Sequence, residues 1–115
     1  RRVAVAYHPL EFRHGPIAVA GPGTVAVVLG TEAGARLEAA LIRDLRRLGT
    51  TVVLLRDEGR AATEADVDVT LGMGLSDAAR SILYLPFAQA LAYWRAVGSG
   101  LDPDRPQHLT AAVHL

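Results

Sequence analysis

The sequence predicts an α/β fold built around a parallel sheet, and three consecutive segments carry this prediction. Residues 25–29 (Val-Ala-Val-Val-Leu) and residues 51–55 (Thr-Val-Val-Leu-Leu) are apolar runs of strand length, as expected for strands buried on both faces. Between them, residues 31–48 carry apolar side chains at helical spacing. Strand, helix and strand in this order form a crossover unit, so we expect parallel strands joined by a right-handed connection.

Shorter signals flank and delimit this unit. Residues 4–14 predict a short helix or turn that is interrupted by Pro9 and ended by the Gly-Pro pair at 15–16, because proline disfavours a continuing helix. We expect Thr31 to cap the central helix and Gly49 to end it. The apolar stripe predicted for that helix consists of Leu37, Leu41, Leu45 and Leu48.

The second half of the chain predicts one more strand and a long helix. Residues 67–71 alternate apolar and polar side chains and suit a third strand, which follows a polar loop at residues 57–65. The helix from about residue 78 to 97 is apolar on most sides, so we expect it to be buried, with a bend near Pro86. Three strands make a thin sheet whose uncovered edges favour association.

Composition excludes several classes of function. The chain of 115 residues suffices for one domain with its own core, and 12 basic against 12 acidic residues argue against a nucleic-acid surface or a polybasic membrane anchor. Cysteine is absent, which excludes disulfides and thiolate metal sites. No apolar run approaches the ~20 residues of a membrane span, and the one near the N-terminus is too short for a secretory signal. We therefore expect a cytoplasmic protein without a metal or cofactor.

The most informative stretch is Glu-Phe-Arg-His-Gly-Pro at residues 11–16. It holds His14 at the end of the first predicted element, next to a carboxylate and a guanidinium. An imidazole exchanges protons near neutral pH, so this arrangement suits proton transfer. The alternative is a surface helix end, where a histidine favours the negative end of the helix dipole.

This stretch resembles the Glu-(Leu/Phe)-(Lys/Arg)-His-Gly-Pro segment of sugar isomerase (SIS) domains, most of all the second SIS domain of glucosamine-6-phosphate synthase and its relatives. Residues 89–93 (Gln-Ala-Leu-Ala-Tyr) and 100–109 are similar to that family's Gln-Leu-Leu-Ala-Tyr…Gly-Thr-Asp-x-Asp-x-Pro-x-x-Leu ending. The resemblance covers nearly the whole chain. It implies a three-layer α/β/α fold around a five-stranded parallel sheet. Residues 1–115 would then be the later part of a C-terminal SIS domain, with its first strands and its Ser/Thr-rich phosphate loop upstream.

For function, the resemblance implies a phosphorylated sugar as ligand. The implied chemistry is aldose–ketose or aminosugar-phosphate interconversion, as in glutamine–fructose-6-phosphate aminotransferase-like enzymes. His14 matches the family histidine that helps to open the sugar ring and reaches across a subunit interface. Glu11, one helical turn earlier, would orient His14, with a solvated glutamate as the alternative. The family's catalytic glutamate lies upstream of residue 1, so we expect this chain alone to be inactive and the intact protein to be a homodimer or larger.

One departure from the family weakens the aminotransferase interpretation. All twelve basic residues are arginines, so the family's lysine near the C-terminus has no counterpart and no Schiff-base lysine exists in this chain. A deglycase or deaminase relative fits this departure better. Two non-enzymatic alternatives are a sugar-phosphate-binding or regulatory module and a dimerisation half that buries Tyr93 and Trp94 against another chain.

The remaining candidate residues have weaker sequence signals. The glycines of Gly72-x-Gly74 allow a close approach to a phosphate at a helix N-terminus, with a plain turn as the alternative. Two acidic pairs, at 57–58 and at 66 and 68, are typical of solvated loop charge rather than of a metal site. The remaining histidines lack the spacing of metal ligands, and they are His8, His108 and His114.

Overall fold

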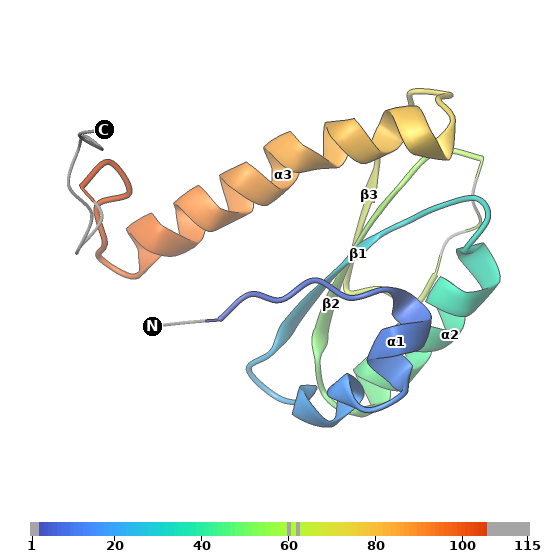
Figure 1. Cartoon of the computed structure of the whole chain (residues 1–115), viewed down its shortest axis with the longest axis horizontal. Coiled ribbons are helices and arrows are strands. Elements are labelled where there is room, and N and C mark those ends of the chain that lie inside the picture. Colours follow the sequence, from blue (N-terminus) through green and yellow to red (C-terminus); the bar gives the residue numbers. More distant parts are fainter. Residues whose placement is uncertain (1–2, 60, 62, 106–115) are drawn as a thin grey trace, which may run out of the picture. The chain divides into compact units, whose positions relative to one another are not determined.

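The computed structural model describes residues 3–59, 61 and 63–105 and shows an α/β fold (Figure 1). The chain divides into two compact units, Arg1–Arg80 and Ser81–Leu115. The first unit contains the sheet, and the second contains most of the last helix. In chain order the elements are α1 (Pro9–Arg13), the 3₁₀ helix η1 (Pro16–Val19), β1 (Val25–Leu29), α2 (Ala35–Arg47), β2 (Thr51–Arg56), β3 (Val67–Thr70) and α3 (Asp77–Gly98).

The sheet has three parallel strands in the order β1-β2-β3, which confirms the predicted parallel pairing. Val28 pairs with Leu54 across β1 and β2, and Val53 pairs with Val67 across β2 and β3. The central strand β2 is buried, as predicted for both apolar runs. For β1 that prediction is wrong, because β1 lies at an edge of the sheet and leaves Leu29 46% exposed.

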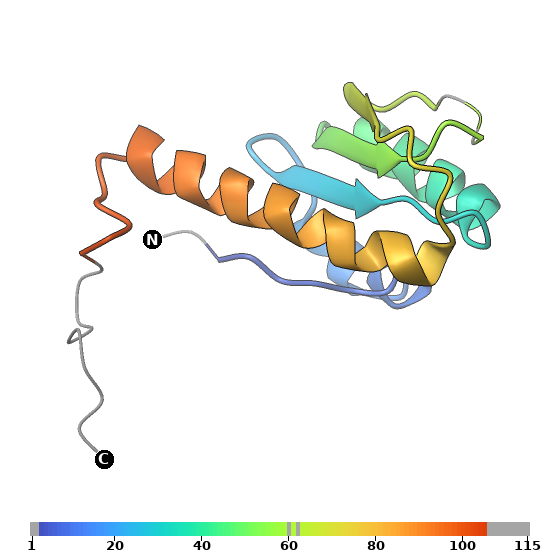
Figure 2. The same ribbon diagram turned by 90° about the horizontal axis from the view of Figure 1, so that it is seen from above.

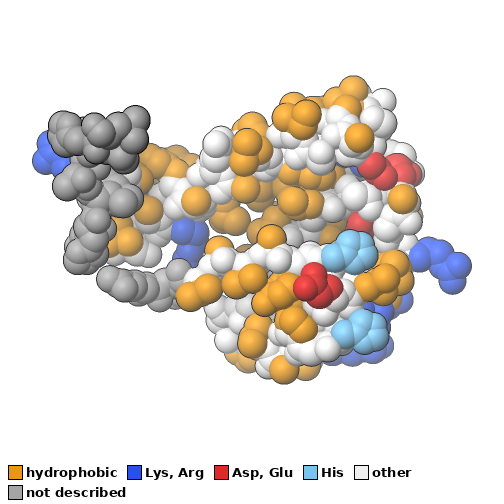
Figure 3. All heavy atoms as spheres, viewed as in Figure 1, with side chains coloured by type: hydrophobic (Ala, Val, Ile, Leu, Met, Phe, Trp, Pro, Cys, Tyr) orange, Lys and Arg blue, Asp and Glu red, His pale blue; other side chains and the backbone are white. Residues whose placement is uncertain are grey.

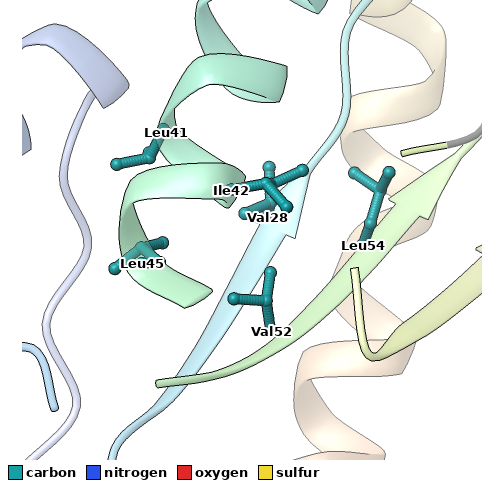
Figure 4. Packing of buried hydrophobic residues seen from close by; sticks show 6 residues of the cluster. All are labelled: Val28, Leu41, Ile42, Leu45, Val52 and Leu54. Carbon is teal, nitrogen blue, oxygen red and sulfur yellow. The ribbon is translucent and has the colours of Figure 1, made fainter. Parts of the chain in front are cut away.

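The core lies between α2 and one face of the sheet (Figures 2 and 4). Its buried members are Val28, Leu41, Ile42, Leu45, Val52 and Leu54. The predicted stripe on α2 is correct at its centre and wrong at its ends, since Leu37 and Leu48 are 40% and 45% exposed. At 100° per residue the fully buried Ile42 lies about 140° from Leu37 and about 120° from Leu48 around the helix axis, so the buried face turns away from both of these leucines.

The boundaries of the helices correct two expectations and confirm a third. Pro9 begins α1 instead of interrupting it, because the first position of a helix needs no N–H donor. Thr31 is not the N-cap of α2, because the helix starts at Ala35 and Gly34 is its N-cap, but the Thr31 hydroxyl accepts a capping type of hydrogen bond from Gly34 N–H (2.9 Å) in the turn just before the helix. Gly49, at φ +80°, follows the end of α2 as predicted.

The last helix, α3, runs without interruption through Pro86. Large apolar side chains along it are exposed, with Ile82 at 71% and Trp94 at 68%, and the burial of this helix stays a prediction. In the described part of the chain, no helix is both long and apolar enough to cross a membrane. The end of the second family motif, residues 106–109, lies outside the described residues, as do His108 and His114.

Candidate functional site

Apolar side chains on both sides of His14 pack against the core, and the polar side chains between them face solvent. In α1, Phe12 packs against the core cluster and its ring lies 5.4 Å from the ring of Tyr7. Ile17, on η1, packs against the same cluster. Glu11 and His14 are exposed. The sequence therefore anchors both sides of His14 while leaving its imidazole in contact with solvent.

His14 occupies the C-cap of α1, where its backbone N–H donates to the carbonyl of Glu11 (3.1 Å). Gly15 follows at φ +152°, a conformation that only glycine adopts without strain. Pro16 then begins η1. The expectation that His14 lies at the end of an element is confirmed, and Gly15 makes the sharp change of direction immediately after it.

An ion pair fixes the neighbouring arginine of the motif. The guanidinium of Arg13 lies 2.7 Å from a carboxylate oxygen of Asp44, on α2, with the two side chains about one-third exposed. This pair connects α1 to α2, which also packs on the sheet. Of the three polar side chains of the motif, Arg13 is thus used for attachment, and the other two face solvent.

Glu11 and His14 share an exposed face without touching through their side chains. Figure 3 shows histidine and acidic side chains gathered on one face over α1. Within the described residues, no hydrogen bond or ion pair joins the Glu11 carboxylate to the His14 imidazole. Glu11 lies in the first turn of α1, where a carboxylate favours the positive end of the helix.

A second cluster of charged residues lies at the carboxyl ends of the strands. Arg80, in the first turn of α3, is 3% exposed, and its guanidinium lies 3.2 Å from the carboxylates of Asp57 and of Asp77. It also donates to the carbonyl of Leu75 (2.6 Å). Asp57 directly follows β2 and is 4% exposed, so the expectation that it is solvated loop charge is wrong.

Asp57 organises the loop after β3. Its carboxylate accepts hydrogen bonds from the N–H groups of Met73 (2.9 Å) and Glu58 (3.0 Å). These bonds, that of Met73 foremost, lower the pKa of Asp57 below its ordinary value, and Arg80 adds to the effect. Gly72 and Gly74 both have φ +60°, as the tight turn around this carboxylate requires. The two glycines therefore form a turn around the Asp57 carboxylate, as in the plain-turn alternative to a phosphate-binding loop.

Asp77 plays the corresponding part at the loop between β1 and α2. Its two carboxylate oxygens accept from the N–H groups of Glu32 (2.9 Å) and Ala33 (3.2 Å), just before α2 begins. In a doubly wound sheet, N–H groups at this position commonly bind anions. Here the chain's own carboxylate takes them, so this cluster joins three loops to one another.

Asp66 and Asp68 also make polar contacts. Asp68 lies 2.7 Å from the guanidinium of Arg56 on the neighbouring strand, and Asp66 accepts from Val52 N–H (2.8 Å). Both aspartates are exposed, as expected for solvated charge, but Asp68 lies on β3 rather than in a loop. In the part of the chain that the structure describes, no three His, Asp or Glu side chains are grouped as metal ligands.

Sequence reasoning missed Arg80 and Asp77. A local signal existed, because Asp77 and Arg80 are three residues apart at a helix start and form an ion pair across that spacing. The contact of Arg80 with Asp57 joins residues far apart in the sequence and has no local signature. His8, set aside for lack of ligand spacing, is the N-cap of α1.

The chain is similar to enzymes of aminosugar metabolism over nearly its whole length. It is 33% identical over 112 residues to glutamine–fructose-6-phosphate aminotransferase [isomerizing] of Clostridium acetobutylicum, covering 96% of this chain. The same named enzyme of Pseudomonas aeruginosa is 32% identical over 113 residues, again over 96% of this chain. A protein of Streptomyces coelicolor named "Putative D-galactosamine-6-phosphate deaminase AgaS" is 33% identical over 110 residues, or 90% of this chain.

These matches cover a small part of each relative. The chain spans 18% of the length of the two aminotransferases and 29% of the Streptomyces protein. No family model matches the chain. No solved structure matches it either.

Proposed function

We propose that residues 1–115 form the later part of a SIS domain that binds a phosphorylated sugar. The observation that carries the proposal is the motif at 11–16, with His14 exposed at the end of an anchored helix. Similarity over 96% of the chain to two aminotransferases that, by name, act on fructose 6-phosphate supports it. The remaining strands of the sheet and the phosphate loop would come from sequence outside these residues.

In this proposal His14 assists the opening of the cyclic sugar. Ring opening removes the proton of the anomeric hydroxyl and delivers a proton to the ring oxygen, so it needs a group that both accepts and donates near neutral pH. The exposed imidazole at the end of α1 meets that need. Glu11, on the same face, would contribute its charge to the environment of His14 without a direct hydrogen bond. The base that then moves a proton between C1 and C2 would lie outside this chain.

The second candidate is an aminosugar-phosphate deaminase. The absence of lysine favours it, because the SIS resemblance implies a lysine near the C-terminus and the matching position in this sequence is Ala112. The Streptomyces relative, named "Putative D-galactosamine-6-phosphate deaminase AgaS", supports the same alternative. A non-catalytic sugar-phosphate-binding module would show ligand binding without turnover of either kind.

We further propose that the intact protein is a homodimer or larger. The exposed apolar side chains of α3, Trp94 and Tyr93 among them, are costly in water and suit burial against another chain. A monodisperse monomer at micromolar concentration in light scattering would contradict this.

The first test of ligand class is thermal stabilisation. In the full-length protein, fructose 6-phosphate, glucosamine 6-phosphate or galactosamine 6-phosphate at 100 times its Kd should stabilise the fold by about 2.7 kcal/mol. The matched unphosphorylated sugars are the controls and should have little effect. Stabilisation by nucleic acid and by none of these sugars would contradict the proposal.

The second test addresses the role of His14. In the full-length protein, His14→Asn should reduce turnover of the cyclic sugar phosphate by about 10²-fold, the scale of a lost acid–base group. Turnover of an open-chain substrate should change far less, because only the cyclic form needs ring opening. Equal losses on both substrates would remove the ring-opening role. A large fall in melting temperature without a specific kinetic loss would assign His14 a structural role.

A further inference from the structure

The helix that presents His14 is too short to be stable by itself. Five residues make little more than one turn, and isolated helices of that length do not form in water. Its geometry therefore depends on what holds it. Phe12 fixes its inner side to the core, and Arg13 binds Asp44 near its C-terminal end. The N-terminal end needs a separate attachment.

At that end His8 supplies a local cap, because its side chain binds a backbone N–H group of α1 itself. It has an extended backbone (φ −71°, ψ 142°), as an N-cap residue should, and its Nδ1 accepts from the N–H of Leu10 (3.3 Å). Its carbonyl accepts from the N–H of Phe12 (2.9 Å). Pro9 between them has no N–H to satisfy. The side chain and the carbonyl of one residue thus bind two of the first N–H groups of α1.

This bond also defines the form of the imidazole. When Nδ1 accepts a hydrogen bond, a neutral histidine carries its single hydrogen on Nε2. The His8 and His14 residues are both exposed. A histidine protonated at both nitrogens cannot make this cap.

We propose that His8 is a positioning residue for His14. It holds the N-terminal end of α1 so that the C-cap, six residues later, keeps its place beside the bound sugar. The proposal rests on the proposed function for its kinetic consequence, but the cap itself is testable without any turnover. His8 does not enter the ring-opening step.

Two variants of His8 distinguish loss of the N-cap from loss of the imidazole ring. His8→Ala removes the acceptor, and His8→Asn keeps one, since asparagine is among the best N-cap residues. In the full-length protein, His8→Ala should lower turnover of the cyclic sugar phosphate about fivefold with little change in KM, the scale of one lost cap. His8→Asn should recover turnover to within about twofold. His8→Ala should lower the melting temperature by no more than a few degrees, the scale of one lost cap, and His8→Asn should keep it.

Spectroscopy gives a readout independent of activity. Nitrogen-15 NMR of the wild-type imidazoles should show His8 with hydrogen on Nε2. Hydrogen exchange of the Leu10 amide should accelerate about fivefold in His8→Ala and stay near wild type in His8→Asn. Hydrogen on Nδ1, or unchanged exchange in His8→Ala, would overturn the cap. Equal kinetic losses in both variants would overturn the positioning role and assign the effect to the imidazole itself.

Failure of the proposed function gives a different pattern. In that case His14→Asn would leave sugar-phosphate turnover unchanged, or the wild type would show none. The tautomer and the amide exchange would still decide whether His8 caps α1. If the spectra show the cap but His8→Ala leaves sugar-phosphate turnover unchanged, the positioning role of His8 is refuted. The cap then remains a structural feature of α1 alone.

Discussion

The two clusters of polar residues in this chain differ in how they are built. The segment around His14 is exposed and local, and six consecutive residues carry its polar chemistry. The cluster around Arg80 is largely buried, and it brings Asp57, which follows β2, together with Asp77 and Arg80 in the first turn of α3. The first is suited to meet a ligand, and the second to fix the loops at the carboxyl ends of the strands. Buried charge therefore marks structure here, and exposed charge at an anchored helix end marks the candidate site.

The largest effect should come from breaking the buried cluster. Arg80→Met leaves the Asp57 carboxylate without its guanidinium partner in a site that is 4% exposed. Removing one partner of a buried pair is strongly destabilising, so we expect the melting temperature to fall on the order of 10 °C. Arg95→Met is the matched control, because Arg95 lies on the same helix and is exposed. Equal melting curves for the two variants would mean that the cluster contributes nothing to stability.

The contrast between the clusters also explains how far the sequence could predict the molecule. The strands and α2 were predictable because apolar runs and helical spacing are local patterns, and the end of α1 was predictable from Gly15 and Pro16. The burial of Asp57 was not, because it depends on Arg80 arriving from 23 residues later. The exposure of β1 follows from its place at an edge of the sheet, and strand order is a property of the whole fold.

A smaller effect should appear at the exposed site itself. Gly15→Ala places a side chain at φ +152°, where no atom of the described structure lies within 4 Å of the new Cβ, so the cost is backbone strain alone. We expect a loss of about 1–3 kcal/mol in unfolding free energy, with a displaced His14 and reduced sugar-phosphate turnover. Gly98→Ala, equally open but without a left-handed φ, is the control and should be neutral or slightly stabilising. If both variants behave alike under urea denaturation, the conformation of Gly15 places no constraint on this segment.

The smallest effect concerns the pH dependence of the buried cluster. The pKa of Asp57 is lowered, chiefly by the N–H of Met73 and then by that of Glu58, so its carboxylate stabilises the folded state when it is ionised. A lowered folded pKa gives stability that is present above the unfolded value of about 3.9 and is lost as pH falls through the folded value. The stability difference between wild type and Asp57→Asn should therefore be constant from pH 5 to 7 and shrink below about pH 4. Glu58→Gln, an exposed neighbour, should leave the acid limb of the wild-type curve unchanged. Urea denaturation at a series of pH values measures the unfolding free energy of wild type and of each variant. If the difference between wild type and Asp57→Asn grows as the pH falls, the protonated form of Asp57 is the stabilising one.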